Sequence, residues 1–272
     1  MIDILSEIIA HKRKEVATQK GRLSLSELEK RLATVMETVP FYSMKAALES
    51  SQSGIIAEFK RRSPSKGWLS HPADPGKPGQ DVREVTTAYA SAGASVLSVL
   101  TDEEYFGGTM ADLRQATSGV QIPVMRKEFI VDEYQLFEAK LAGASAVLLI
   151  AAAITPEECK RFTEQANQLG LEVLLELHDE REVDYIGPRN KLVGINNRNL
   201  GSFVTDLQKS FRMAGLLPKE AVWISESGIS DPGIVKELRQ AGYRGFLIGE
   251  HFMKSTHPGQ SLKVFIDSIV IQ

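Results

Sequence analysis

Cysteine is almost absent from this sequence of 272 residues, which contains a single one, Cys159. A framework of disulfides within the chain is therefore excluded, and a reducing compartment such as the cytosol suits the protein. A strong net charge is also missing. The formal value is −3, so no overall basic field is present that would hold nucleic acid, and we expect no nucleic-acid partner.

Long hydrophobic runs are lacking as well. The longest, residues 146–154, is too short to span a bilayer, and the first residues lack the basic start and apolar run of a secretory signal. We therefore expect a soluble, cytoplasmic protein with no membrane partner. The five histidines are scattered, with neither an HExxH motif nor paired spacing, so we expect no metal site.

What the sequence does contain is a globular composition, with 43% hydrophobic and 25% charged residues. Its length suits one α/β barrel of roughly 250 residues. Apolar residues recur at helical spacing within the first 50 residues, as in Ile4, Ile8 and Leu25. Because each such helix has one apolar stripe, residues 1–50 are predicted to form a helical extension packed on residues 51–272.

From residue 55 onward, short apolar runs alternate with amphipathic segments. The eight runs are 55–60, 95–100, 123–127, 146–151, 172–177, 192–196, 222–226 and 245–249. Strands that alternate with helices form a parallel sheet, and eight such units predict a closed (β/α)8 or TIM barrel. The alternative is an open doubly wound sheet. A nucleotide-binding fold of that kind would carry GxGxxG after its first strand, where this chain reads RRSPSKG.

A near-repeat supports this unit. Residues 89–97 resemble residues 139–147, and a weaker copy occurs at 240–243. In each copy a glycine is predicted to end a helix and turn the chain into the next strand.

Polar side chains end five of the predicted strands, where barrels carry their catalytic residues. They are Glu58, Lys60, Lys127, Glu176, Asn196 and Glu226. Any one of them could be a strand end that meets water, but together they would converge on one mouth. Glu58 and Lys60 are two residues apart and share a face. Acidic and basic groups held close in a partly buried site shift each other's pKa values, which suits proton transfer.

The ends of the last two strands indicate a phosphate site. Ser227, Gly228 and Gly249 offer small residues and backbone N–H groups where barrels commonly bind phosphate, although ordinary turns are the alternative. The carboxylate of Glu250 would repel an anion there. We therefore expect this side chain to point away and only its N–H to donate.

One segment after the first strand is rich in proline and glycine. Residues 71–80 read HPADPGKPGQ, which is typical either of a mobile lid at the mouth or of a passive insertion. Both alternatives stay open.

Five longer motifs run through the predicted barrel. They are EFKRRSPSKG at 58–67, LTDEEYFGG at 100–108, RKEFIVD at 126–132, GINNRNL at 194–200 and SESGI at 225–229. Together these motifs resemble the signature of the indole-3-glycerol-phosphate synthase family. The resemblance covers essentially the whole chain, and the first motif is the most specific.

The resemblance implies an activity, that of a lyase of tryptophan and aromatic amino acid biosynthesis. Such a decarboxylase acts on a small phosphorylated partner, 1-(2-carboxyphenylamino)-1-deoxyribulose 5-phosphate, and forms indole-3-glycerol phosphate with loss of CO2 and water. It implies no cofactor. The sequence does not determine the oligomeric state, and a monomer rather than a homo-oligomer is our working expectation.

By position, the resemblance makes Lys127 the general acid of ring closure and Lys60 the partner of the substrate carboxylate. Glu176 is the second acid–base residue, and whether it or Lys60 donates the dehydration proton stays open. The remaining strand-end residues would position groups and stabilise charge. These are Glu58, Asn196 and Glu226.

The resemblance also assigns binding residues. Those of the phosphate region are Ser63, Ser227, Gly228, Gly249 and Glu250, while Arg198 would orient loop or substrate groups. Those that would pack on the aromatic ring are Phe106, Phe129, Leu148 and Leu200. For these four, ordinary core packing is an equal alternative.

Two other functions are alternatives to this activity. Another phosphate-binding barrel, such as phosphoribosylanthranilate isomerase, relies on a cysteine at strand 1 and an aspartate at strand 6. Glu58 and Asn196 occupy those strand ends here, and Cys159 lies in a predicted helix. A non-catalytic barrel would have lost some of its charged strand ends, and this chain has them all.

Overall fold

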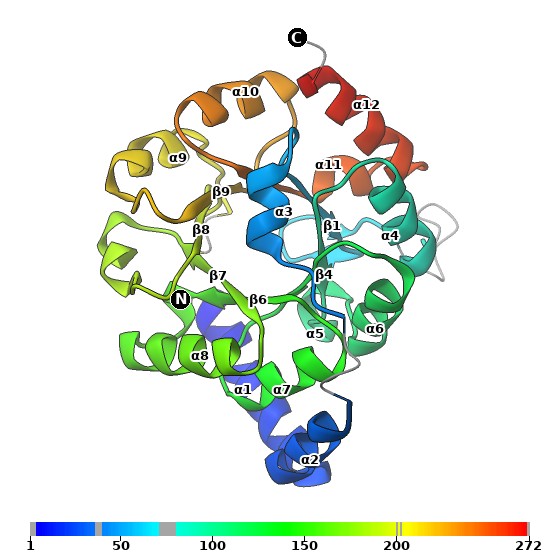
Figure 1. Cartoon of the computed structure of the whole chain (residues 1–272), viewed down its shortest axis with the longest axis vertical. Coiled ribbons are helices and arrows are strands. Elements are labelled where there is room, and N and C mark those ends of the chain that lie inside the picture. Colours follow the sequence, from blue (N-terminus) through cyan, green and yellow to red (C-terminus); the bar gives the residue numbers. More distant parts are fainter. Residues whose placement is uncertain (1–3, 36–39, 71–79, 200, 202, 271–272) are drawn as a thin grey trace.

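Eight parallel strands close into a barrel in the computed structural model, which describes residues 4–35, 40–70, 80–199, 201 and 203–270 (Figure 1). The strands are β1 (Ile55–Phe59), β4 (Val96–Leu100), β5 (Val124–Lys127), β6 (Ala146–Ile150), β7 (Glu172–Leu177), β8 (Leu192–Asn196), β9 (Val222–Glu226) and β10 (Gly245–Ile248). β1 closes the ring, because it pairs with both β4 and β10. The predicted barrel is confirmed, and the open sheet is excluded.

The strands form where the apolar runs are because helices cover the outside of the barrel and side chains fill its inside. Every residue of β4 and β6 is buried, as expected for parallel strands that are covered on both faces. Figure 1 shows the helices as a ring around the strands. They are α4 (Val82–Ser91), α6 (Met110–Gly119), α7 (Tyr134–Leu141), α8 (Pro156–Gln168), α9 (Gln208–Met213), α10 (Pro232–Gln240) and α12 (Pro258–Val270).

The expectation of a helix after every strand is wrong after β7. A 3-10 helix, η2 (Glu180–Tyr185), follows there instead of an α-helix. Asp179 begins it by accepting a hydrogen bond from the backbone N–H of Arg181. Gly187 and Pro188 follow within three residues of its end, and because proline restricts its predecessor to extended backbone, the helix cannot continue through them.

Glycines end the helices of the near-repeat, as predicted. Gly93, Gly143 and Gly242 have φ of 98°, 82° and 109°, which is left-handed backbone. A side chain would strain each turn between helix and strand.

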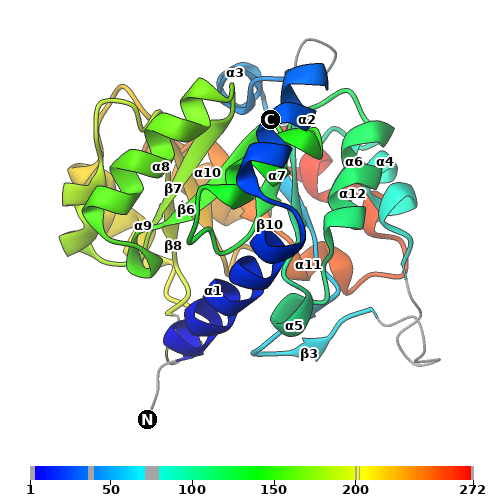
Figure 2. The same ribbon diagram turned by 90° about the horizontal axis from the view of Figure 1, so that it is seen from below.

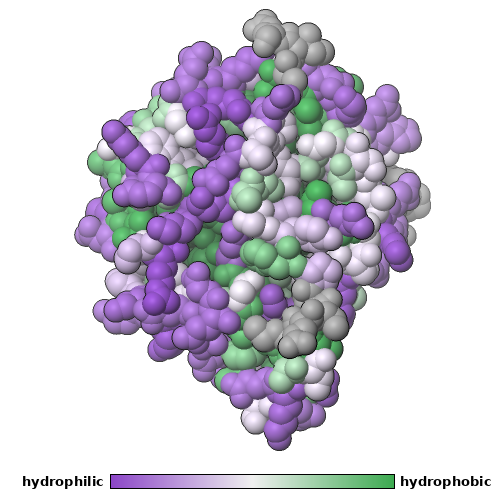
Figure 3. Space-filling model, viewed as in Figure 1, coloured by the Kyte–Doolittle hydropathy of each residue, from purple (hydrophilic) through white to green (hydrophobic). Residues whose placement is uncertain are grey.

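Three helices precede the barrel: α1 (Ile4–Arg22), α2 (Leu25–Val35) and α3 (Met44–Ser50). Figure 2 shows α3 at one end of the barrel, whereas α5 (Glu103–Phe106), β3 (Gly67–Trp68) and the start of α1 lie at the other. Glu172 at the start of β7 holds α3 in place by accepting from Ser43 Oγ (2.7 Å) and from the backbone N–H of Met44 (2.5 Å). The face around α3 is a mixture of hydrophilic and small apolar areas (Figure 3).

Two further features bear on the mouth. β2 (Arg62–Ser63) and β3 form a small antiparallel hairpin directly after β1. Apart from Gln80, the proline- and glycine-rich segment 71–80 lies outside the described residues. Within the described part of the chain, the search for a helix long and apolar enough to cross a membrane found none.

Candidate active site

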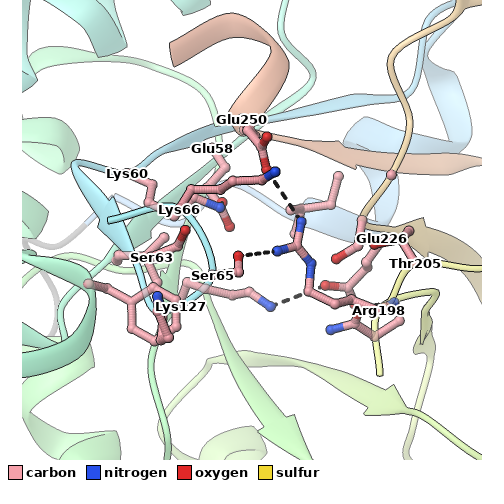
Figure 4. A pocket seen from close by; sticks show the side chains of 18 of the residues that line it. Glu58, Lys60, Ser63, Ser65, Lys66, Lys127, Arg198, Thr205, Glu226 and Glu250 are labelled. Atoms are coloured by element: carbon pink, nitrogen blue, oxygen red, sulfur yellow. Dashed lines mark hydrogen bonds and ion pairs between the residues drawn. The ribbon is translucent and has the colours of Figure 1, made fainter. Parts of the chain in front are cut away.

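A cavity of about 580 Å³ opens at the C-terminal ends of the barrel strands. All six polar strand-end residues identified in the sequence line it, namely Glu58, Lys60, Lys127, Glu176, Asn196 and Glu226. They come from five strands, and Figure 4 shows Lys60, Lys127 and Glu226 around one space. The structure therefore brings together the residues that the spacing predicted would converge.

Lys127 lies between two carboxyl groups. Its Nζ is 2.7 Å from Oε2 of Glu176 and 3.2 Å from Oε2 of Glu226. Both carboxyl side chains are almost completely buried, at 2% and 1% exposed. Asn196 fixes the orientation of Glu176, because its Nδ2 donates to Oε1 over 3.1 Å.

At neutral pH, the titratable groups of Lys127, Glu176 and Glu226 together hold two of the three protons that they could bind. Burial alone would lower the pKa of Lys127, but the charge of Glu176 raises it well above the ordinary value, and Glu226 adds to this effect only when it is ionised. Burial opposes the ionisation of Glu176, yet the Lys127 ammonium holds the pKa of that carboxyl well below its usual range. At neutral pH, Lys127 is therefore a cation and Glu176 an anion.

Glu226 is in the opposite state. Burial raises the pKa of this carboxyl to about 8, and the charge of Glu176 adds to the effect while Lys127 opposes it. Its Oε1 atom is also buried without a hydrogen-bond partner among the described residues, which would be costly for a charged oxygen. A neutral acid and an ionised base thus lie on either side of the same ammonium.

His178 was missed by the sequence reasoning. Its Nε2 lies 3.1 Å from Oε1 of Glu176, and its side chain is 10% exposed. The signal that could have found it is its spacing, two residues after Glu176 at the end of the same strand.

Glu58 and Lys60 form the second charged pair of the mouth. Lys60 Nζ is 2.7 Å from Oε1 of Glu58, which confirms that the two side chains share a side of the strand. Gly249 lies against this pair, because a β-carbon there would come within 2.5 Å of the same oxygen. The absence of a side chain at Gly249 therefore makes room for Glu58 and also leaves the backbone of Gly249 accessible.

The turn after β9 has the left-handed backbone expected of an anion-binding loop. Ser227 and Gly228 have φ of 70° and 80°, and both line the cavity together with Ser63 and Gly249. Two lysines that the sequence reasoning did not single out, Lys66 and Lys254, line it as well.

Arg198 crosses the mouth beside this turn (Figure 4). It donates to Oγ of Ser65 (2.6 Å) and to Oε2 of Glu250 (3.3 Å). The expectation that the Glu250 side chain points away is wrong, because two cations face it: Arg198 and, at 2.7 Å, Lys254. The carboxylate is held in the cavity wall by these two ion pairs.

The other side of the cavity is apolar. Phe106, Phe129 and Leu148 line it, with the two phenyl rings 5.9 Å apart, while Leu200 lies outside the described residues. Ile4, Leu5 and Ile8 of α1 also line the cavity. Their helical spacing marks an apolar stripe but carries no information on which surface the stripe covers, so the sequence could not place them here.

Other kinds of site are not indicated by the described residues. A search among them for groups of three or more histidine, cysteine or acidic side chains that could hold a metal ion found none. Cys159 lies in α8, 1% exposed, and burial raises the pKa of its thiol to about 11. A role for this cysteine at a strand end is thereby excluded.

Comparisons with known proteins place the whole chain in one family. The family model described as indole-3-glycerol phosphate synthase matches residues 5–265. The chain is 56% identical over 269 residues to the indole-3-glycerol phosphate synthase of Bacteroides thetaiotaomicron, covering 99% of this chain and 100% of that protein. It is 40% identical over 270 residues to the enzyme of the same name from Acidithiobacillus ferrooxidans, covering 98% and 100%.

Solved structures share the fold at low identity. Tryptophan synthase from Pyrococcus furiosus superposes with a TM-score of 0.58 at 12% identity, over 80% of this chain and 98% of that one. The alpha subunit of tryptophan synthase from Legionella pneumophila gives 0.59 at 13% identity, over 85% and 98%. At such identity the likeness concerns the barrel alone.

Proposed function

Because this chain belongs to the indole-3-glycerol phosphate synthase family, we propose that its barrel mouth converts 1-(2-carboxyphenylamino)-1-deoxyribulose 5-phosphate into indole-3-glycerol phosphate. Enzymes of this family are carboxy-lyases of tryptophan biosynthesis. The reaction forms one carbon–carbon bond and releases one CO2 and one water. The observation that carries the assignment of roles is the position of Lys127 between an ionised Glu176 and a protonated Glu226.

The shape and charge of the cavity support this substrate. An apolar side with Phe106 and Phe129 suits the aromatic ring, and the left-handed turn at Ser227 and Gly228 suits the phosphate. Lys60 is available to the ring carboxylate. The substrate would thus lie across the mouth, with its ketone near Lys127.

In the first step, Lys127 acts as the general acid. The ring carbon that bears the carboxylate attacks the ketone carbon, and the Lys127 ammonium gives a proton to the ketone oxygen, which becomes a hydroxyl group. The ionised Glu176 keeps Lys127 protonated before the substrate binds. Lys60 holds the carboxylate until CO2 leaves. The bond between the ring carbon and the carboxyl carbon then breaks, and its electron pair stays with the ring and restores its aromaticity.

In the second step, the new hydroxyl group leaves as water. An acid must protonate it, and a base must take a proton from the adjacent carbon so that the indole double bond forms. We assign the base to Glu176, because Lys127 keeps it ionised, and the acid to Lys60. Glu58 holds Lys60 at 2.7 Å, and Asn196 holds Glu176 at 3.1 Å.

The test is direct turnover. The purified chain is mixed with the anthranilate-derived substrate, in the presence and absence of a chelator, and indole fluorescence and released CO2 are followed together. We expect equal amounts of both products. Failure to form indole with the correctly folded protein would contradict the proposal, as would turnover of N-(5-phosphoribosyl)anthranilate in its place.

A further inference from the structure

Lys12, on α1, is a charged residue in the interior of the protein. Its side chain is 1% exposed, although lysine is almost never buried to this extent without partners. Nζ lies 3.0 Å from Oδ2 of Asp102, 3.2 Å from Oε1 of Glu128 and 2.8 Å from Oε2 of Glu15. Burial alone would lower the pKa of Lys12, but Glu128 and Asp102 raise it well above its ordinary value, so the group is an ammonium ion.

The first of these partners controls the position of Phe106. Asp102 caps α5 by accepting from the backbone N–H of Tyr105 over 2.7 Å, and its carbonyl accepts from the N–H of Gly108 over 2.9 Å. Phe106 is the last residue of α5. A shift of the Asp102 carboxylate would therefore move the helix that carries this ring.

The second partner lies beside the other ring. Glu128 stands between Lys127 and Phe129 in the chain, and its Oε1 accepts from the backbone N–H of Phe129 over 2.8 Å. Its Oε2 accepts from Oγ1 of Thr101 over 2.8 Å. This hydrogen bond from Thr101 also joins the loop after β4 to the loop after β5. It does not involve the Asp102 carboxylate, which caps α5.

Lys12 thus connects the two segments that carry the facing rings of the cavity. Phe106 belongs to the loop after β4, Phe129 to the loop after β5, and the rings are 5.9 Å apart. Without the ammonium, two carboxyl groups that are 0% and 1% exposed would face each other with no cation from α1. Arg126 would still lie 3.6 Å from Glu128, but the attraction of one cation for both carboxylates, which draws the two loops together, is lost.

We propose that Lys12 is a positioning residue that acts through Asp102 and Glu128 to hold Phe106 and Phe129 together as one contacting pair of rings, against which the substrate's aromatic ring binds. The inference rests on the function proposed above. Lys12 does not touch the cavity itself, whose α1 lining consists of Ile4, Leu5 and Ile8 among the described residues.

The test compares Lys12→Met and Lys12→Arg with a matched control on the same helix. Lys20→Met removes an ion pair of 2.9 Å to Asp132, which also joins α1 to the segment after β5 but is 38% and 31% exposed. Two competitive inhibitors report on the two sides of the cavity: N-methylanthranilate for the ring side and inorganic phosphate for the other.

For Lys12→Met we expect the inhibition constant of N-methylanthranilate to rise about tenfold, as for the loss of an aligned aromatic contact. The constant for phosphate should stay within about twofold, because the residues assigned to the phosphate lie in the loops after β1, β8, β9 and β10, whereas Lys12 acts on those after β4 and β5. The KM for the substrate should rise more than kcat falls. Lys12→Arg should recover part of the ring affinity, and Lys20→Met should match the wild type.

A double variant, Lys12→Met with Glu128→Gln, distinguishes the loss of ring positioning from a general loss of stability. Relative to Lys12→Met it removes one further buried charge, that of Glu128, and keeps a side-chain oxygen that can accept from the backbone N–H of Phe129. We expect thermal stability to recover while N-methylanthranilate stays weakly bound. Wild-type affinity for N-methylanthranilate in Lys12→Met or in the double variant would overturn the inference. Equal weakening of N-methylanthranilate and phosphate binding would overturn it as well. Absence of wild-type turnover would instead count against the proposed function.

Discussion

Lys127 and Glu176 form an ion pair across the interior of the barrel, from the end of β5 to the end of β7, with 2.7 Å between Nζ and Oε2. β6 lies between these strands in the sheet, so the two side chains meet over the mouth and not along neighbouring backbone. The pair is 49 residues apart in the chain. Its geometry explains why the proton state of the mouth depends on Lys127.

Replacement of this lysine gives the first prediction. Lys127→Met should keep the fold and lower kcat at least about a thousandfold, because the proton donor of ring closure is lost. Circular dichroism and indole fluorescence measure the two effects. The control is Lys45→Met, which breaks an ion pair with Glu49 on α3 at the opposite end of the barrel. Near-normal indole formation by Lys127→Met would rule out the proposed role.

The second prediction concerns stability and pH. The pKa of Glu226 is about 8 in the folded protein and 4.5 as its ordinary value. Between these values the folded state binds one proton more than the unfolded state, so the contribution of Glu226 is complete below pH 4.5 and is lost as the pH rises toward 8. Relative to Glu226→Gln, the wild type should lose free energy of unfolding at on the order of 1 kcal/mol per pH unit.

Urea unfolding of both proteins at several pH values in this window measures the difference. Parallel curves would mean that Glu226 ionises normally in the folded protein.

A third prediction follows from the contact between Gly249 and Glu58. In Gly249→Ala the new methyl group must displace the Glu58 carboxylate, since it would lie within 2.5 Å of Oε1. Because Glu58 holds Lys60, we expect kcat to fall about a hundredfold. The melting temperature should fall as well, because the new β-carbon would also lie 2.9 Å from Cβ of Glu58, which cannot rotate away. Gly215→Ala is the matched control, as a β-carbon there meets nothing within 4 Å. Equal activity of the two variants would refute the dependence of Lys60 on this contact.

The fourth prediction concerns the phosphate side. Arg198→Met should raise the inhibition constant of inorganic phosphate about tenfold, the effect of removing one charge-assisted contact, and leave that of N-methylanthranilate unchanged. Arg212→Met, which breaks the exposed pair with Asp206, should change neither. A phosphate ion bound elsewhere in the barrel, with none near Arg198 and Gly228, would contradict this assignment.

Much of the architecture could be predicted from the sequence, because a parallel strand that is covered on both faces needs a continuous apolar run. β7, β8 and β9 begin and end where the runs 172–177, 192–196 and 222–226 predicted. The segment after β7 was not predicted: it is a 3-10 helix, which Gly187 and Pro188 keep short. Polar residues at the ends of these runs marked the mouth for the same reason, because a charge in a buried strand is costly except at its end.

The sequence by itself therefore determined the closed barrel and the six polar strand-end residues that line the cavity at one end of it. Which of these residues touch was decided only by tertiary structure. Lys127 meets both Glu176 and Glu226, Arg198 draws in Glu250, and α1 brings Ile8 to the mouth. The physical reason is that periodicity within a strand or helix fixes the face of a side chain, whereas its partner depends on how the barrel closes and where distant segments dock.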